Sequence, residues 1–424
     1  MRRSECVGCV ALVGAGTGRE NPYPTCAGGC LNWHIVTGKA SLKRKWEKPD
    51  DQGRVLDQSQ FPELNALFYT ASPSDFIRMR INVMALIAAP DSALAPAFAV
   101  DRELGSVRVT AGPVPDLDLR MQYMRTETVA IVHHASETLL RLYFAHIDHP
   151  ESPWLGMSAS TNFVELKERV GDLLDVGFDR KVIAELFMGG SSPVDAGIDI
   201  TQEEFDDAVK ALSFLLWDCG CRFIDDAYLY NAVKHGLAAI DLPGGTPKME
   251  ATDEDGTQIP LHEGPAHIYL HQKLNPTASP SDSQWFVSID DPNPERDLSV
   301  AFVITQAIES LWAVARRRYI GEPGSIWCLN LSAVHLAVYG PVDHAAKAMR
   351  RMSTELSKLK PDGNADEPKH HITMYDFPNN WDPQGKERKP ALRQIELPIR
   401  PQDVHTPATT GYLPFVRKGF QRER

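Results

Sequence analysis

The sequence predicts a mainly α protein, in which a helical bundle carries a small antiparallel β insertion and both ends are irregular. Three observations support this class. Apolar residues recur every three or four positions through residues 117–147, and a capping box at Thr201–Glu204 opens a second helical stretch. Between residues 248 and 290 the apolar period changes to two. Periods near 3.6 are typical of amphipathic helices, whereas a period of two is typical of strands.

The composition is that of a globular chain with an acidic body. The 424 residues are 43% hydrophobic and 24% charged, which is enough to build a core. Residues 1–50 and 341–424 each carry a net charge of +4, so residues 51–340 carry −20. Because non-specific binding of nucleic acid needs basic surface, this balance argues against it. No apolar run reaches the length that spans a bilayer and no signal peptide is recognised, so we expect a cytoplasmic protein without membrane contact.

Four parts are expected along the chain. Residues 1–60 form a Cys- and Gly-rich segment, and residues 61–116 form a mixed α/β segment. The helical bundle occupies residues 117–320, with its β insertion at 248–290. A C-terminal helical and irregular extension follows over residues 321–424.

The N-terminal segment contains four of the seven cysteines. Cys6 and Cys9 form one pair and Cys26 and Cys30 a second, with spacing close to that of a zinc ribbon. Zinc is therefore the one cofactor that the sequence suggests. The alternative is a disordered leader, or residues upstream of a true start at Met79 or Met84.

The elements before residue 200 follow from local patterns. We expect a helix over Asp75–Leu86 and strands within Phe98–Thr110, turning at Gly105. The long helix at 117–147 has a seam of apolar or small residues spaced three or four apart. Its members are Leu117, Met121, Met124, Thr128, Ile131, Ala135, Leu139, Leu142 and Ala145. Two shorter helices are expected near 163–173 and 182–187.

After Thr201 we expect helix to about Ile240, with either a bend or a junction of two abutting helices at Cys219-Gly220-Cys221. The strands expected next are Lys248–Thr252, Gln258–Leu261, His267–His271 and Gln284–Ile289. An apolar helix follows at Leu298–Tyr319, and Ile326–Tyr339 fits either strand or helix. Asp343–Leu359 is expected to be a last amphipathic helix, and the chain from Pro361 onward to be largely irregular.

One polar cluster lies near a helix end. Asn231, Lys234 and His235 share a face, because helical residues three or four apart are neighbours. An amide that orients an imidazole, an ammonium that holds phosphate and an imidazole that moves a proton suit nucleotide chemistry. The other interpretation is structural, since Lys and His complement the dipole at a helix C-terminus and a glycine, Gly236, commonly follows.

A second polar cluster lies on the long helix. His133 and Glu137 are four residues apart and could pair or bind a metal, and His134 lies beside them. A buried, hydrogen-bonded histidine pair is the structural alternative. We treat all three as candidate substrate-binding residues, together with Lys234, and hypothesise that this helix packs opposite Asn231 and His235 to form one polar cleft.

These motifs together resemble the HEPN superfamily. The resemblance rests on Ala135–Leu142 and on Tyr230-Asn231-Ala232-Val233-Lys234-His235-Gly236, and covers about residues 117–240 and 298–319. It implies an all-helical up-and-down bundle, often dimeric, in a superfamily that includes RNA-cleaving toxins, defence proteins and inactive RNA- or nucleotide-binding relatives. Catalytic members carry an arginine ahead of the histidine, where this chain has tyrosine or leucine. The catalytic role therefore carries over only to His235, with Asn231 as its polar neighbour.

The sequence thus predicts a HEPN-like bacterial module in nucleic-acid- or nucleotide-linked defence or regulation, without the standard ribonuclease arginine. RNA or a nucleotide is the expected partner, and a homodimer through the helical bundle is the expected assembly. The alternative is a non-catalytic structural or interaction protein in which Asn231–His235 only packs a helix end. A third reading is a metal-dependent protein organised by the N-terminal cysteines.

Overall fold

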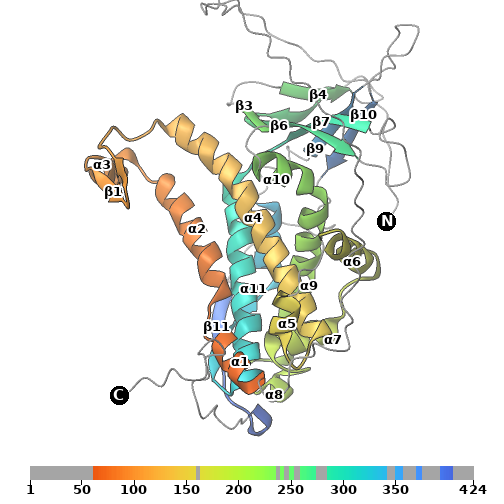
Figure 1. Cartoon of the computed structure of the whole chain (residues 1–424). Coiled ribbons are helices and arrows are strands. Elements are labelled where there is room, and N and C mark those ends of the chain that lie inside the picture. The colour runs from red at the N-terminus through yellow and green to blue at the C-terminus, as the bar shows by residue number, and fades with distance from the viewer. Residues whose placement is uncertain are drawn as a thin grey trace, which may run out of the picture.

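Figure 1 shows the computed structural model of the chain, which is mainly helical with several small antiparallel sheets. It describes residues 61–158, 163–234, 239–242, 248–252, 258–273, 284–340, 349–356, 369–374 and 392–403. The candidate residue His235 and the cysteines Cys6, Cys9, Cys26 and Cys30 lie outside these ranges, so the structure does not describe their surroundings.

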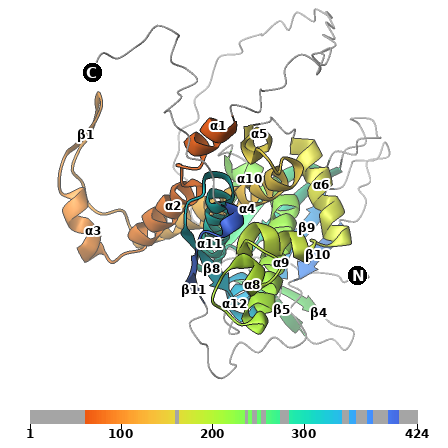
Figure 2. The same cartoon turned by 90° about the horizontal axis from the view of Figure 1, so that it is seen from below.

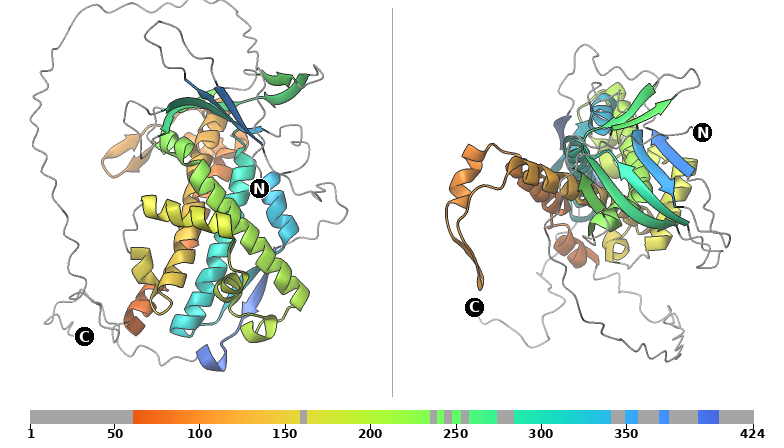
Figure 3. Two further views of the ribbon diagram at one scale, coloured as in Figure 1. Left: turned by 90° about the vertical axis from the view of Figure 1, so that its right-hand side faces the viewer. Right: turned by 90° about the horizontal axis from the view of Figure 1, so that it is seen from above.

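Three long helices form the centre of the molecule. Helix α4 (Leu117–Asp148) packs against both α9 (Gln202–Asp225) and α11 (Pro294–Ile320), and the three share one hydrophobic core (Figures 1 and 3). The expected long helices at 117–147 and 298–319 are confirmed. The capping box is confirmed too, because the Thr201 hydroxyl accepts a hydrogen bond from the Glu204 amide while the Glu204 carboxylate accepts one from the Thr201 amide.

Shorter helices surround these three. They are α1 (Phe61–Phe68), α2 (Pro73–Ile87), α3 (Asp91–Phe98), α5 (Pro153–Ser158), α6 (Phe163–Val176), α7 (Arg180–Ile183), the π-helical turn η3 (Ala184–Met188), α8 (Pro193–Ala196), α10 (Ala227–Lys234) and α12 (Leu331–Tyr339). The short helices expected near 75–86, 163–173 and 182–187 correspond to α2, α6 and the pair α7–η3. The turn expected at Gly105 joins β1 (Arg102–Leu104) to β2 (Val107–Val109), with the glycine at φ 62°.

The bend or helix junction expected at Cys219-Gly220-Cys221 is wrong in position, because α9 continues through all three residues and meets α10 only at Asp226. Gly220 serves close packing instead. A Cβ atom at this position would lie 2.9 Å from Cδ2 of Leu174 on α6. The missing side chain therefore lets the two helices approach each other.

A five-stranded antiparallel sheet lies across one end of the bundle (Figures 1 and 3). Its order is β10-β9-β7-β6-β3. The strands are β3 (Ala239–Leu242), β6 (Ala266–Lys273), β7 (Gln284–Asp290), β9 (Met349–Glu355) and β10 (Lys369–Met374). A separate hairpin pairs β4 (Lys248–Thr252) with β5 (Gln258–Glu263). All four strands expected between residues 248 and 290 are therefore confirmed.

Two expectations about the flanks of this sheet are wrong. The helix expected to continue to Ile240 gives way to β3, which pairs with β6. The helix expected at Asp343–Leu359 is replaced by β9, which pairs with β7 on one side and β10 on the other. Strand pairing overrides the local helical pattern in both places, with partners such as Ile240 and Ile268 or Ser288 and Ser353 far apart in sequence.

The ambiguous stretch Ile326–Tyr339 divides at Asn330. Strand β8 (Gly324–Leu329) ends there, and the Asn330 side chain then caps α12 by accepting a hydrogen bond from the Ala333 amide at 2.8 Å. Strand β11 (Leu392–Leu397) pairs with β8. The expectation of a largely irregular tail is therefore wrong for β10 and β11.

A buried arginine ties this C-terminal segment to the bundle. Arg317 of α11 is 1% exposed and donates hydrogen bonds to the carbonyl oxygens of Ala196 at 2.6 Å and Gly189 at 2.7 Å. Its Nε lies 3.3 Å from Oδ2 of Asp403, in the 3₁₀ turn η6 (Pro401–Asp403). One side chain thus joins α11, the turn after η3 and the segment beyond β11.

Among the described residues, α11 is long and apolar enough to cross a membrane, with a mean hydropathy of 1.6 over 18 residues. The expectation that no segment is long and apolar enough to span a bilayer is therefore wrong. The share of that window buried inside the structure is 72%, because α11 packs against α4, α2, α12 and β8. The bent helix pair α1–α2 with α3 also passes when it is counted as one span.

Buried His146 makes stability depend on pH. The geometry suits a neutral imidazole: Nδ1–H donates to the Leu142 carbonyl oxygen at 2.8 Å and Nε2 accepts from the Tyr69 hydroxyl at 3.4 Å. Burial lowers the pKa of His146 from 6.5 to about 4. The folded protein thus binds fewer protons than the unfolded chain, and stability is lost as the pH falls from about 6.5 to about 4.

Between pH 7 and pH 4.5, we expect the free energy of unfolding of a His146→Phe variant to fall by about 2 to 3 kcal/mol less than that of the wild type. Urea unfolding at the two pH values measures this difference. Parallel losses in the two proteins would contradict the assignment of this pH dependence to His146.

Candidate functional site

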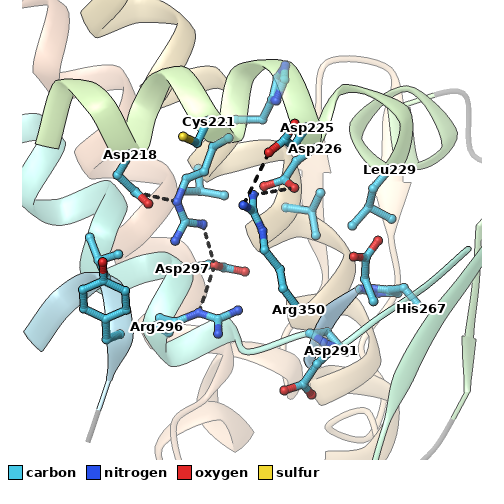
Figure 4. Close-up of a pocket in the computed structure, with 18 of the residues that line it drawn as sticks. Asp218, Cys221, Asp225, Asp226, Leu229, His267, Asp291, Arg296, Asp297 and Arg350 are labelled. Atoms are coloured by element: carbon cyan, nitrogen blue, oxygen red, sulfur yellow. Dashed lines mark hydrogen bonds and ion pairs between the residues drawn. The ribbon is translucent and has the colours of Figure 1, made fainter. Parts of the chain in front are cut away.

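A cavity of about 290 Å³ lies where the bundle meets the sheet (Figure 4). Helices α4, α9, α10, α11 and α12 and strands β6, β7 and β9 supply most of its wall, and the connecting residues Asp226, Asp291 and Pro292 supply the remainder. Its charged and imidazole lining consists of Asp218, Arg222, Asp225, Asp226, Asp290, Asp291, Arg296, Asp297, Arg350, His133 and His267. Apolar side chains, among them Val129, Val132, Leu229 and Val338, complete it.

One ion-pair chain crosses the wall from α9 to α11. The Arg222 guanidinium donates from Nε to Asp218 at 2.7 Å and from Nη1 to Asp297 at 3.1 Å. Arg296 lies 3.8 Å from the same Asp297 carboxylate. The first pair joins residues four apart on one helix, so α9 itself presents both charges to the cavity.

A second chain joins the end of α9 to the sheet. Arg350 and Arg351 of β9 each donate to Oδ1 of Asp226 at 2.9 Å. Arg351 also donates to Asp290 of β7 at 2.9 Å. Arg350 reaches Asp225 at 3.7 Å. Strand pairing between β7 and β9 sets this geometry, because it places Asp290 opposite Arg351.

The carboxylates respond differently to burial. Burial raises the pKa of Asp226, but the charges of Arg350 and Arg351 outweigh it and hold that pKa at about 2. Burial raises the pKa of Asp290 in spite of Arg351, and it raises the pKa of Asp225 in spite of Arg350. Asp226 is therefore the firmly ionised member of this chain.

Two buried imidazoles face the cavity. The His133 ring stacks on Tyr230 at 4.1 Å and on Phe223 at 5.6 Å, and burial lowers its pKa. His267 is 1% exposed, and burial lowers its pKa as well. Its Nε2 lies 3.5 Å from Oδ1 of Asp241, yet within the described residues neither ring nitrogen makes a hydrogen bond. A buried imidazole in this state is available to a ligand.

Carboxylates outnumber cations in this lining. Six aspartates face three arginines, and burial favours the neutral form of the two histidines, so the formal charge of the wall is −3. Arg351 lies behind the wall and reduces this excess to two. Cys221 adds no nucleophile, because burial raises the pKa of its thiol to about 12.

Of the proposed residues that the structure describes, all but His133 lie away from this cavity. Asn231 and Lys234 are exposed on α10, and Nζ of Lys234 lies 5.7 Å from the Tyr230 ring centre. Neither residue lines the cavity. Helix α10 does pack against α4, as the cleft hypothesis requires, but the residue that meets His133 is Tyr230.

His134 and Glu137 project elsewhere on α4. Nδ1 of His134 lies 3.3 Å from Nη1 of Arg80 on α2. Glu137 accepts a hydrogen bond from Nε of Arg141 at 2.8 Å, which makes an ordinary pair on one helix. His133 is thus the one substrate-binding candidate that lines the cavity. No group of three or more His, Cys, Asp or Glu side chains in the described part of the chain is arranged to hold a metal ion.

Sequence reasoning missed the charged residues of the cavity. Weak signals were present: Asp218 and Arg222 interrupt the apolar face of α9, and Asp225-Asp226, Asp290-Asp291 and Arg350-Arg351 are adjacent like-charged pairs. Each pair lies near an element end, where solvated charges are common. No pattern in the sequence around these pairs shows that they lie close together in the fold.

The fold and the site define a helical bundle whose end, beneath an antiparallel sheet, encloses an acidic, ion-paired cavity. A scan of protein-family models, a search of curated proteins and a search of solved structures found no match to this chain.

Proposed function

We propose that this chain is a non-catalytic binding module whose cavity holds a small organic cation with a short apolar stem. The observation that carries the proposal is the excess of carboxylates in a preformed, partly apolar cavity, together with a buried imidazole, His267, whose ring nitrogens make no hydrogen bond within the described residues. Replacing a buried ion pair by well-packed apolar side chains is often neutral for stability, so net stability alone does not account for a network of this density.

The size and charge of the cavity define the ligand class. A volume of about 290 Å³ is at the small end of ligand pockets and fits a small ligand. A guanidinium or ammonium group would gain charge-assisted hydrogen bonds from the surplus carboxylates. A phosphate group would lose its hydration next to these carboxylates. The arginines of the lining would not offset this loss, because each of them already lies within 4 Å of an aspartate.

We also propose that the bundle is HEPN-like, as the motifs on α4 and α10 suggest. The side-by-side arrangement of α4, α9, α10 and α11 supports this relationship. A regulatory binding role fits a member that lacks the ribonuclease arginine and whose Asn231 is exposed. The acidic cavity favours a cationic metabolite over the nucleotide partner expected from the sequence.

Calorimetric titration tests the proposal. Agmatine carries a guanidinium and an ammonium on a short aliphatic stem and is the probe, with ATP as the anionic comparison. We expect saturable binding of agmatine that weakens as salt rises. Saturable ATP binding without agmatine binding would overturn the proposal.

Replacing Asp291 by asparagine tests the cavity itself. Its carboxylate is 12% exposed and lies 3.6 Å from His262, so the isosteric change removes charge with little change in packing. We expect agmatine affinity to fall roughly tenfold or more, since charge-assisted hydrogen bonds contribute about 1.5 to 3 kcal/mol.

Asp175→Asn is the matched control, because it makes the same charge change on exposed α6 outside the cavity. Its affinity for agmatine should equal that of the wild type. Equal weakening in both variants would show that agmatine responds only to net charge.

A further inference from the structure

We infer that this chain forms a two-fold dimer through an arm made of α2, α3, the β1–β2 hairpin and the first turns of α4. This inference is independent of the cavity. It rests on an apolar surface that nothing in the described part of the chain covers. Figures 2 and 3 show α3 and the hairpin projecting away from the bundle.

The outward face of α2 is apolar. Phe76, Met79, Val83 and Leu86 are 42 to 63% exposed and follow one another at steps of three, four and three residues. The opposite face, with Ile77, Ile81 and Met84, is the one buried against the bundle. An apolar stripe with this spacing is the seam by which helices pair.

The hairpin adds to this surface and has no core of its own. All six residues of β1 and β2 are exposed, and Leu104 and Val107 are 68 and 59% exposed. Two-stranded hairpins are marginal by themselves in water. A partner that covers this hairpin would stabilise it.

The start of α4 continues the same face. Leu119 and Tyr123 are 57 and 48% exposed. Arg120 joins this end of α4 to α2 and α3. It donates to the carbonyl oxygens of Ile87 and Ala89 and pairs with Asp91. Arg80 of α2 pairs with Glu127 of α4 at 2.6 Å, which holds the α2 stripe beside the exposed residues of α4.

The area fits a dimer of this chain. Eleven large apolar residues of the arm are 39 to 68% exposed, and at about 60 to 120 Å² for each fully exposed side chain they present roughly 400 to 700 Å² of apolar surface. A stable interface buries about 800 Å² per partner, of which roughly 65% is apolar in homodimers.

Charge and symmetry favour a second copy over other occupants. Residues 73–109 carry four basic and four acidic side chains, so the arm attracts neither an anionic membrane nor a charged partner. Residues 1–60 are a poor match because they are basic and rich in glycine. A two-fold axis places the same uncharged stripe on both sides of the interface, so each stripe buries the other.

Sedimentation equilibrium of the full chain tests the dimer. We expect a mass of about twice 47.1 kDa for the wild type and a dissociation constant at least ~30-fold higher for Val83→Glu. The matched control is Val194→Glu, which adds the same charge at a valine that is 92% exposed on α8, far from the arm in sequence. This control should remain dimeric.

Leu104→Glu is the second variant, because a residue of the exposed hairpin can change without disturbing the core. It should also shift the protein to monomer while circular dichroism stays unchanged. A monomeric wild type, or a dimer that survives both arm substitutions, would overturn the inference. Binding of the wild type to phosphatidylserine vesicles that is lost in Val83→Glu would overturn it in favour of a membrane surface.

Discussion

Replacing Arg351 by methionine is expected to lower the free energy of unfolding by about 3 to 5 kcal/mol, the cost of leaving buried charge unpaired. Its guanidinium is the only described cation bonded to Asp290, and it also donates to Asp226 and to the Asp225 carbonyl oxygen. The side chain is 13% exposed, so water cannot replace these bonds. Urea unfolding measures the loss.

Two further variants sharpen this prediction. Arg393→Met removes a pair with Glu204 whose side chains are 55 and 43% exposed, and should cost no more than about 1 kcal/mol. Adding Asp290→Asn to Arg351→Met should recover part of the loss, because it removes the stranded carboxylate. A loss of the same size in the Arg351 and Arg393 variants would refute the buried network.

Replacing Arg317 by methionine should cost about 3 kcal/mol, because two hydrogen bonds from a charged donor to buried carbonyl groups are lost. Those carbonyls belong to Gly189 and Ala196. Gly189 has φ 83°, and a Cβ there would lie 2.3 Å from Nη2 of Arg317. A side chain at position 189 would therefore displace the Arg317 guanidinium. Thermal and urea unfolding both measure the effect.

The neighbouring residue Arg316 is the control. It pairs with Glu322 at the surface, where both side chains are more than 40% exposed, so Arg316→Met should cost less than about 1 kcal/mol. The Arg317 variant should also expose residues 392–403 to protease earlier than the wild type. Stability equal to that of Arg316→Met would contradict the anchoring role.

The elements that the sequence predicted correctly are those with local causes. The seam of α4 and the capping box of α9 depend on residues within a few positions of one another. Alternation likewise predicted β4 to β7. Gly220 misled the prediction, since a glycine inside a helix can break it or admit a neighbour, and only the position of Leu174 shows which.

The site escaped prediction because its residues meet through long-range pairing. Asp226 closes a helix, Asp290 ends a strand and Arg351 comes from a segment that looked helical, yet β7 and β9 bring the three together. Of the predicted candidates that the structure describes, only His133 lines the cavity. The conspicuous pair Asn231 and Lys234 is exposed on α10 instead.

The central claim is that the acidic cavity binds a small organic cation, and a crystal structure of the protein grown with agmatine tests it most directly. We predict electron density for agmatine between Asp291 and Asp225, within hydrogen-bonding distance of at least one of these carboxylates. We also predict an ordered contact between agmatine and His267. Density at another surface with the cavity filled only by water would contradict it.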